Sequence, residues 1–534
     1  MDPIEIKKVL VASLPEDGQS GDYYTPEYAM NDFSVYPPLG VLYVATGIEG
    51  HYPVEALDPV AKRLNIEQTV AAILRSAPTV LGLSCQTYRI FPCAEIVKRV
   101  KAAQPEIITV VGGAHTTAYP METAALPGVD YVVVGDGDTS LKLLLDALQS
   151  GDEKKLDEVP GLIFKSDGAL KQNPVANNTN LDSIPIPNRD LLDMKDYYTA
   201  ADGASEIITM ISSRGCPFRC IYCDVLEKKY RVRSAQNVVD EMEYISKKYN
   251  DPVIHIFDDT YNLTKKRVIE ISQEIIRRQL RVKWTTRARV APFDEEMVAL
   301  MARSGLKRAH FGVESGSPLS LQKTLKGIRV EQIEKAFDLC RKYGIESLAY
   351  FIIGFDWETK KELKETVKFI GKISPDFIMA NMLHPLAKTK VYDDLLARGV
   401  FDKDYWLEQA TRPVPRFRLP PHRNTKTRKY LRRVLDEVYI SFYLSPKFIM
   451  NNIANKKAAS GNIWTLISEL GFKIRLAFSM LLSWCRNFTI EKLDRGENQI
   501  AEGPANSLPT PGQKNAEFLE AQKPPSDEHH SDAA

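Results

Sequence analysis

Apolar and polar positions alternate in two separate series along the chain, and the first series covers residues 1–155. Continuous runs of Val, Ile and Leu predict strands buried on both faces, and the segments between them carry apolar residues at helical spacing. The predicted strands are Val9–Leu14, Val54–Leu57, Val80–Ser84, Ile107–Val111 and Tyr131–Val134. The predicted helices are Leu39–Glu49, Ile66–Arg75, Pro92–Ala103 and Thr139–Gln149. This pattern predicts an α/β fold with a doubly wound, Rossmann-like parallel sheet.

A second series covers residues 201–400. Its predicted strands are Ile207–Ser212, Val253–Phe257, Val282–Thr286, Ala309–Val313, Ser347–Ile353 and Phe377–Asn381. Its predicted helices include Ala235–Lys248, Lys265–Arg278, Asp294–Arg303, Val330–Tyr343 and Lys360–Ile373. Six β/α units in succession predict a partial (β/α)6 barrel, with reactive groups at the carboxyl ends of its strands. Between the two series, residues 156–200 predict a hairpin at Pro160–Lys171, which turns at Asp167-Gly168, and then a linker.

The pattern changes again after residue 400. Residues 401–490 predict a helical region that includes Thr425–Tyr443 and Ile463–Trp484. Charged residues interrupt the apolar positions of Ile463–Trp484, so this segment is not expected to span a membrane. This helix either lies in a membrane interface or packs on its own domain. Residues 491–534 are polar and rich in Pro, which predicts a disordered tail.

The overall charge and the cysteine count exclude several classes of protein. The 534 residues include 70 Lys plus Arg and 69 Asp plus Glu, and the formal net charge of +1 gives no reason to expect a nucleic-acid partner. The first apolar run is too short for a signal peptide or a membrane span. Seven cysteines are an odd number in a chain without an export signal. We therefore expect a cytoplasmic protein whose thiols are reduced and serve metal binding or catalysis.

Three cysteines, Cys216, Cys220 and Cys223, follow a predicted strand and precede a predicted helix. Cysteine thiolates hold iron–sulfur clusters, and three ligands leave one iron of a [4Fe–4S] cluster open. An open iron allows S-adenosylmethionine (SAM) to bind through its amino and carboxylate groups and to be cleaved reductively. The alternative is a structural zinc site, but zinc requires four ligands and no fourth Cys or His lies nearby in the sequence.

With Tyr222 before its last cysteine, this CxxxCxxC motif resembles the radical SAM superfamily. Later segments agree with the superfamily in order and spacing, and each of them ends a predicted strand: His255–Thr260, Phe311–Gly316 and Phe351–Phe355. The resemblance implies a set of SAM contacts. Glu314 and Ser315 would contact SAM, Ile353 and Gly354 would lie near its adenine, and Tyr222 would pack beside the cluster and the adenine.

Two acidic residues and two loops leave alternatives open. Asp258 and Asp259 are either polar contacts to SAM or substrate, or helix N-caps. The chain departs from the superfamily at Asp356–Glu358, where Pro-Gly-Glu is usual, and at Ala387–Thr389, where Pro-Gly-Thr is usual. These two loops are therefore expected to differ in geometry from those of the superfamily.

Glycines end two adjacent strands of the first series, at Val110–Gly113 and Val134–Gly137, where they let the backbone approach a ligand closely. Together with Pro37–Gly40 and the radical SAM motif downstream, they resemble the cobalamin-binding radical SAM class over Lys8–Gly399. The resemblance implies cobalamin contacts from Ser84, Thr87, Gly112 and Gly113. His115 is either a further contact, to the corrin or its tail, or a plain loop histidine. The Asp-x-His-x-x-Gly signature is absent, as is common in this class, where cobalamin binds with its own base displaced. The alternative is a degenerate domain that binds no cobalamin.

The resemblance implies a cobalamin-dependent methyltransferase. A 5′-deoxyadenosyl radical would take hydrogen from an unactivated carbon, methylcobalamin would supply the methyl group, and a second SAM would recharge the cobalt. Alternatives are a cobalamin-dependent cyclase or ring-modifying enzyme, a methylthiotransferase, and a non-catalytic cobalamin or Fe–S sensor. The layout also resembles members that act on hopanoid or other isoprenoid lipids and on porphyrins, so we expect a small-molecule substrate of that kind. A reductant such as flavodoxin or ferredoxin is implied, and the C-terminal helices predict peripheral membrane contact.

Overall fold

The computed structural model describes residues 2–16, 34–199, 202, 206–423, 425–443, 445 and 448. The chain divides into two units, Met1–Phe488 and Thr489–Ala534, and all described residues belong to the first. The predicted helix Ile463–Trp484 and the predicted disordered tail 491–534 lie outside the described residues.

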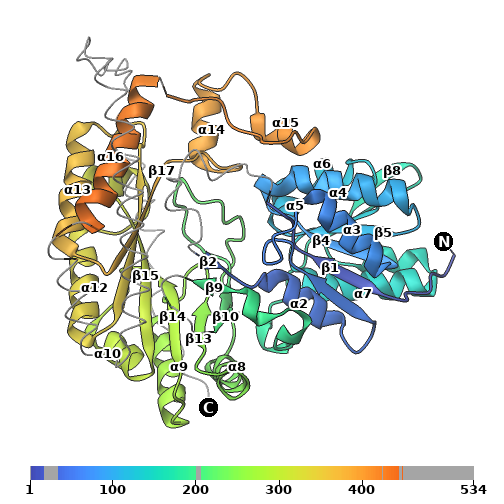
Figure 1. Ribbon diagram of the computed structural model, residues 1–534, viewed down its shortest axis with the longest axis horizontal. Coiled ribbons are helices and arrows are strands. Elements are labelled where there is room, and N and C mark those ends of the chain that lie inside the picture. The colour runs from blue at the N-terminus through green and yellow to red at the C-terminus, as the bar shows by residue number, and fades with distance from the viewer. Residues whose placement is uncertain are drawn as a thin grey trace, which may run out of the picture. The chain divides into compact units, whose positions relative to one another are not determined.

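The first sheet has seven strands in the order β3-β1-β4-β5-β6-β7-β8. Figure 1 labels β1, β4, β5 and β8 of this sheet. Five of the seven strands are parallel: β3 (Val54–Leu57), β1 (Val9–Ala12), β4 (Val80–Ser84), β5 (Ile108–Gly112) and β6 (Tyr131–Val133). Their order is the flavodoxin-like variant of the doubly wound fold, so the predicted α/β class is confirmed. The predicted hairpin is β7 (Leu162–Ser166) and β8 (Ala169–Gln172), and it extends the sheet in antiparallel fashion beside β6.

Helices cover both faces of this sheet. One apolar core lies beneath α3 (Ile66–Ser76) and α4 (Ile90–Ala103), and a second lies beneath α2 (Leu39–Ile48) and α7 (Gly137–Ser150). The last two helices pack closely because a Cβ at Gly47 would lie 2.5 Å from the Asp138 carbonyl oxygen. Two short helices, α5 (Ala114–Ala118) and α6 (Pro120–Ala124), follow β5 and were not predicted.

The second sheet has six parallel strands in chain order. They are β10 (Ile207–Met210), β13 (Val253–Ile256), β14 (Lys283–Ala288), β15 (Leu306–Glu314), β16 (Glu346–Ile353) and β17 (Phe377–Met382). The helices between them are α8 (Ala235–Lys248), α9 (Lys265–Arg277), α10 (Glu295–Arg303), α11 (Pro318–Lys323), α12 (Val330–Tyr343) and α13 (Lys360–Ile373). Figure 1 shows α9, α10, α12 and α13 along one side of the sheet, and their apolar faces form one core with it. This arrangement confirms the predicted partial (β/α)6 barrel.

Short elements surround the two sheets. The ribbon β2 (Ser34–Val35) pairs with β9 (Tyr198–Thr199), and β11 (Ser213–Arg214) pairs with β12 (Arg231–Val232). The helices α14 (Lys390–Ala397) and α15 (Tyr405–Thr411) follow the barrel.

The helix α16 (Thr425–Tyr443), which the sequence predicted, covers the edge strand β17. The Tyr439 hydroxyl bonds both backbone groups of Ala380, at 2.9 and 3.0 Å, and the Tyr443 hydroxyl does the same for Ile378, at 3.3 and 3.1 Å. Two tyrosines one helical turn apart thus satisfy alternate residues of an edge that would otherwise expose free N–H and C=O groups. Among the described helices, none is long and apolar enough to cross a membrane.

Candidate active site

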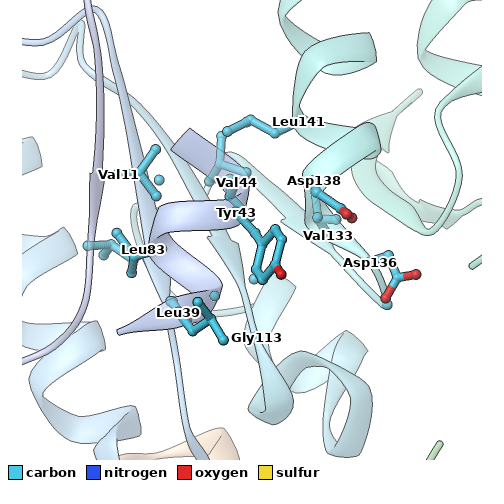
Figure 2. Close-up of a pocket in the computed structure, with 18 of the residues that line it drawn as sticks. Val11, Leu39, Tyr43, Val44, Leu83, Gly113, Val133, Asp136, Asp138 and Leu141 are labelled. Carbon is cyan, nitrogen blue, oxygen red and sulfur yellow. The ribbon is translucent and has the colours of Figure 1, made fainter. Parts of the chain in front are cut away.

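A cavity of about 270 Å³ lies between the first sheet and the pair α2 and α7 (Figure 2). It opens at the carboxyl ends of β4, β5 and β6, where Ser84, Gly112 and Asp136 line it. The strand order reverses between β1 and β4, and open α/β sheets bind their ligands at such a switch point. The cavity therefore occupies the position that the sequence assigned to a cofactor.

Glycines keep this cavity open. Gly113 has φ +99°, and a Cβ there would lie 2.7 Å from the Cys85 carbonyl oxygen, so only glycine fits. Gly40 is exposed on α2, and the atom nearest to a Cβ there is the Ser84 Oγ at 4.0 Å. Ser84, Gly112 and Gly113 all line the cavity, as expected of cobalamin contacts.

Tyr43 supplies a polar atom that needs a partner. Its ring lines the cavity, and Figure 2 shows it on the side of α2 that faces Asp136 and Asp138. Its hydroxyl is buried and has no hydrogen-bond partner within the described part of the chain, and burial raises its pKa. A buried donor without a partner beside a cavity is where a polar ligand group fits, so the residues present suit a cofactor with hydrogen-bonding groups.

Two other predicted cobalamin contacts lie elsewhere. Thr87 is half-buried in a short 3₁₀ helix after β4 and is not among the residues that line the cavity. His115 is fully buried in α5, and neither ring nitrogen has a hydrogen-bond partner within the described segments. Burial lowers the pKa of His115 to about 3, so its imidazole is neutral. Its ring lies 5.5 Å from that of Tyr119. Asp58, directly after β3, is buried and accepts hydrogen bonds from the Ser13 and Tyr197 hydroxyls, so it serves the packing of the domain.

The three cysteines follow β11 in a loop without regular structure. Cys216 is buried, with its Sγ 3.3 Å from the Thr260 Oγ1, whereas Cys220 and Cys223 are half-buried. Burial, followed by the charges of Cys220, Asp224 and Cys216, raises the pKa of Cys223 to about 11. The three thiols therefore share one electrostatic environment, and a bound cation or cluster would reverse this shift. Within the described segments, no three metal-ligating side chains form a site for a single ion.

The two acidic residues after β13 brace the start of this loop. Asp258 is fully buried and accepts four hydrogen bonds of 2.5–3.0 Å from the backbone N–H groups and hydroxyls of Ser212 and Ser213. Asp259 accepts one from the Gly215 N–H at 3.1 Å, and burial and Asp258 raise its pKa. The N-cap of α9 is Thr264, so neither carboxylate caps that helix.

Glu314 ends β15 with an unusual backbone conformation. Its φ is +66°, which a non-glycine residue adopts only at a cost, and such strain gathers at functional sites. Its carboxylate lies 2.5 Å from the Lys326 Nζ, and that ammonium lies 3.3 Å from the Tyr222 hydroxyl. Burial and Glu314 raise the pKa of Tyr222 well above its usual value. Glu314 and Tyr222, both predicted SAM contacts, are thus brought together by a lysine that sequence reasoning missed.

The other predicted SAM contacts lie close by but are less accessible. Ser315 is fully buried, and its Oγ is 2.9 Å from the Thr366 Oγ1. Ile353 is buried at the end of β16. Gly354 follows with φ +95°, and its N–H donates to the Glu358 carboxylate at 2.7 Å. Glu358 also accepts from the Phe355 N–H at 3.0 Å, so it holds the loop that departs from the superfamily pattern.

Comparison with known proteins agrees with this geometry. A model of the Radical SAM superfamily matches residues 210–370, and a model of the B12 binding domain matches residues 31–145. The uncharacterized methyltransferase PH0819 of Pyrococcus horikoshii is 33% identical, over 78% of this chain and 90% of its own length. The chain belongs to the cobalamin-dependent radical SAM enzymes. Its cofactors are a [4Fe–4S] cluster, SAM and cobalamin, as the sequence predicted.

Two further proteins resemble the chain more distantly. The anaerobic magnesium-protoporphyrin IX monomethyl ester cyclase of Rubrivivax gelatinosus is 28% identical over 67% of this chain and 66% of its own length. The methyltransferase TsrM of Kitasatospora setae, solved with tryptophan and a SAM analogue bound, superposes with a TM-score of 0.60. It is 20% identical and covers 73% of this chain and 76% of its own, so it shows a shared fold.

Proposed function

We propose that this enzyme methylates an unactivated carbon of a small molecule. The observation that carries the proposal is that the cavity of the first sheet reaches Arg214, two residues before Cys216, so the two predicted cofactor sites adjoin. The match to PH0819, which bears the name of a methyltransferase, supports the same activity. When bound, the cluster with SAM supplies the radical that removes hydrogen, and cobalamin supplies the methyl group. The chain supplies proximity and orientation.

The cofactor contacts follow from this geometry. Cys216, Cys220 and Cys223 would hold the cluster. Glu314 would bind polar groups of SAM, with Lys326 fixing its carboxylate and Tyr222 packing beside the ligand. Ser315, Ile353 and Gly354 would shape the same end of the barrel.

For cobalamin, the contacts are proposed on the lining of the cavity. Ser84, Gly112 and Gly113 would lie against the cofactor, and the Tyr43 hydroxyl would gain a hydrogen-bond partner. Thr87 and His115 would support the loop and helix behind this wall.

The barrel interior carries a cation suited to a charged substrate. On β14, Trp284 packs among the outer helices, so Arg287 points to the opposite face, where Thr285 bonds His255 of the neighbouring strand at 2.9 Å. Arg287 is exposed, has no ion pair within the described segments, and lies 4.3 Å from the centre of the Phe257 ring. A guanidinium prefers carboxylate or phosphate.

We therefore propose a substrate that bears an acidic group on a flat or apolar body, which favours a porphyrin-like molecule over a neutral isoprenoid lipid. The name of the Rubrivivax relative, which refers to a porphyrin ester, is consistent with this choice. We further propose that a flavodoxin- or ferredoxin-like protein reduces the enzyme. We also propose that the enzyme is cytoplasmic and contacts a membrane peripherally. The helix Ile463–Trp484, on which that contact rests, lies outside the described residues.

The test uses SAM whose methyl group carries deuterium. The reconstituted enzyme is incubated anaerobically with a strong reductant and with small-molecule extracts or carboxylated porphyrins, and products are analysed by mass spectrometry. Methyl transfer predicts a deuterated product that depends on cobalamin and is lost in Arg287→Gln, whereas Arg277→Gln, a change on the outer face of α9, retains it. A cyclase would form 5′-deoxyadenosine and a product without deuterium. That result would reject methyl transfer.

A further inference from the structure

The segment that leads into the cluster loop is held by carboxylates from both domains. From the barrel, Asp258 binds Ser212 and Ser213, and Asp259 binds the Gly215 N–H. Every residue from Ser212 to Gly215 except Arg214 is thus bonded to the loop after β13. The position of Cys216 therefore depends on a short, well-anchored stretch of backbone.

Arg214 itself is held from the other side. Its guanidinium lies 3.0 Å from the Asp136 carboxylate and 3.1 Å from that of Asp138, both at the start of α7. Arg231, its partner across the β11–β12 ribbon, also pairs with Asp136. The side chains of Arg214, Asp136 and Asp138 are only 17, 12 and 3% exposed, so solvent screens these ion pairs weakly.

The same three residues form part of the cavity wall. Arg214, Asp136 and Asp138 all line the cavity, and the Arg214 guanidinium lies 5.4 Å from the centre of the Tyr43 ring. A molecule that fills the cavity therefore touches the ion pairs that hold the cluster loop. Only Gly215, with φ +81°, separates Arg214 from Cys216, and a Cβ at that glycine would lie 2.3 Å from the Lys229 carbonyl oxygen. The connection between the wall and the first cluster ligand is short and has little room to adjust.

We propose that Arg214 is a positioning residue through which cobalamin, by filling the cavity, fixes the cluster loop in the geometry that binds SAM. Asp136 and Asp138 hold the guanidinium in place, and the bound cofactor closes the remaining side of the wall. Because coupling between two binding sites is reciprocal, SAM also strengthens cobalamin binding by the same factor. This inference rests on the cofactor set of the enzyme and not on methyl transfer.

The test measures the dissociation constant of SAM for the cluster-loaded full chain, with and without saturating hydroxocobalamin, under anaerobic conditions. The variant Asp138→Asn keeps the shape of the side chain, so the cavity wall keeps its packing. Arg214 loses its ion pair with residue 138 and keeps the one with Asp136. Asp138→Glu restores the charge, and Arg277→Gln removes an exposed Arg–Glu pair on α9 as a matched control. Iron and cobalt are counted in every sample, and the electron paramagnetic resonance spectrum of the reduced cluster is recorded with SAM.

The proposal predicts that cobalamin tightens SAM binding at least about fivefold in the wild type and in Arg277→Gln, the lower end of typical coupling. In Asp138→Asn, with iron and cobalt still bound, the SAM dissociation constants with and without cobalamin differ by no more than about twofold. The signal of the reduced cluster in this variant no longer changes when cobalamin is added. Asp138→Glu recovers part of both effects. Arg214→Lys, which keeps the charge but loses the two-pronged contact, serves as the second variant and gives the same loss. The proposal is overturned if cobalamin changes the SAM dissociation constant of the wild type by no more than about twofold. It is also overturned if Asp138→Asn and Arg214→Lys keep the same tightening of SAM binding as the wild type. A failure of methyl transfer alone would leave these dissociation constants unchanged, so the two failures are distinguishable.

Discussion

Gly40 offers a way to close the cobalamin cavity without disturbing the rest of the enzyme. It lies in the first turn of α2, is exposed to the cavity, and has no atom closer than 4.0 Å to the position of a Cβ. We predict that Gly40→Phe folds normally, because replacing a helical glycine removes a penalty that is about 1 kcal/mol against Ala. The phenyl ring would occupy space that cobalamin needs.

The loss of affinity follows from the cost of overfilling a packed site. Extra carbon atoms in a well-packed space cost about 1–3 kcal/mol, which corresponds to roughly 5- to 150-fold weaker binding. Titration of hydroxocobalamin into the apoprotein, followed by absorbance, measures this change. Gly371→Phe is the matched control, since Gly371 lies in α13 with no neighbour within 4 Å of its Cβ position. Equal cobalamin affinity in both variants, or loss of iron together with cobalt in Gly40→Phe, would refute the assignment of the cavity.

Three further predictions concern the barrel and the buried histidine. Glu314→Gln leaves the Lys326 ammonium buried without its carboxylate, which costs about 3–5 kcal/mol, and we expect weaker SAM binding in equilibrium dialysis; unchanged SAM affinity would contradict the proposed role. Asp258→Asn replaces a carboxylate that accepts four hydrogen bonds, and reconstituted protein should retain less iron than wild type. The folded pKa of His115, about 3, lies below its unfolded value, so folding stability is lost as the pH falls through the unfolded pKa near 6.5. The unfolding free energy, measured in urea titrations, should therefore fall between pH 8 and pH 5 by about 2 kcal/mol less in His115→Leu than in the wild type. An equal fall in both proteins would show that this histidine is protonated in the folded state.

The periodic segments of the chain could be predicted from the sequence, because each buries a continuous apolar run or stripe. The alternation of β1 to β6 and of β10 to β17 is of this kind, as is α16. The two-residue ribbon β11–β12 and the short helices α5 and α6 carry no periodicity, since they owe their geometry to tertiary contacts.

The site divides in the same way. Cys216 could be named as a candidate from the spacing of cysteines along one loop, and Glu314 from the resemblance of its strand end to the radical SAM superfamily. The cation beside Glu314, Lys326, is twelve residues away in the chain, and Arg214 meets Asp138 across 76 residues. No local pattern indicates such partners. The sequence shows only that acidic and basic residues lie near the strand ends, and it does not show which of them pair.

Metal analysis of the anaerobically reconstituted full chain shows whether the protein holds both an iron–sulfur cluster and cobalamin. The protein is loaded with iron, sulfide and cobalamin, and both metals are quantified beside Cys216→Ala and beside Cys340→Ala, a core cysteine in α12. We expect about four irons and one cobalt per chain, with the iron lost in Cys216→Ala and retained in Cys340→Ala. Equal iron in wild type and Cys216→Ala, or iron without any cobalt, would contradict this expectation.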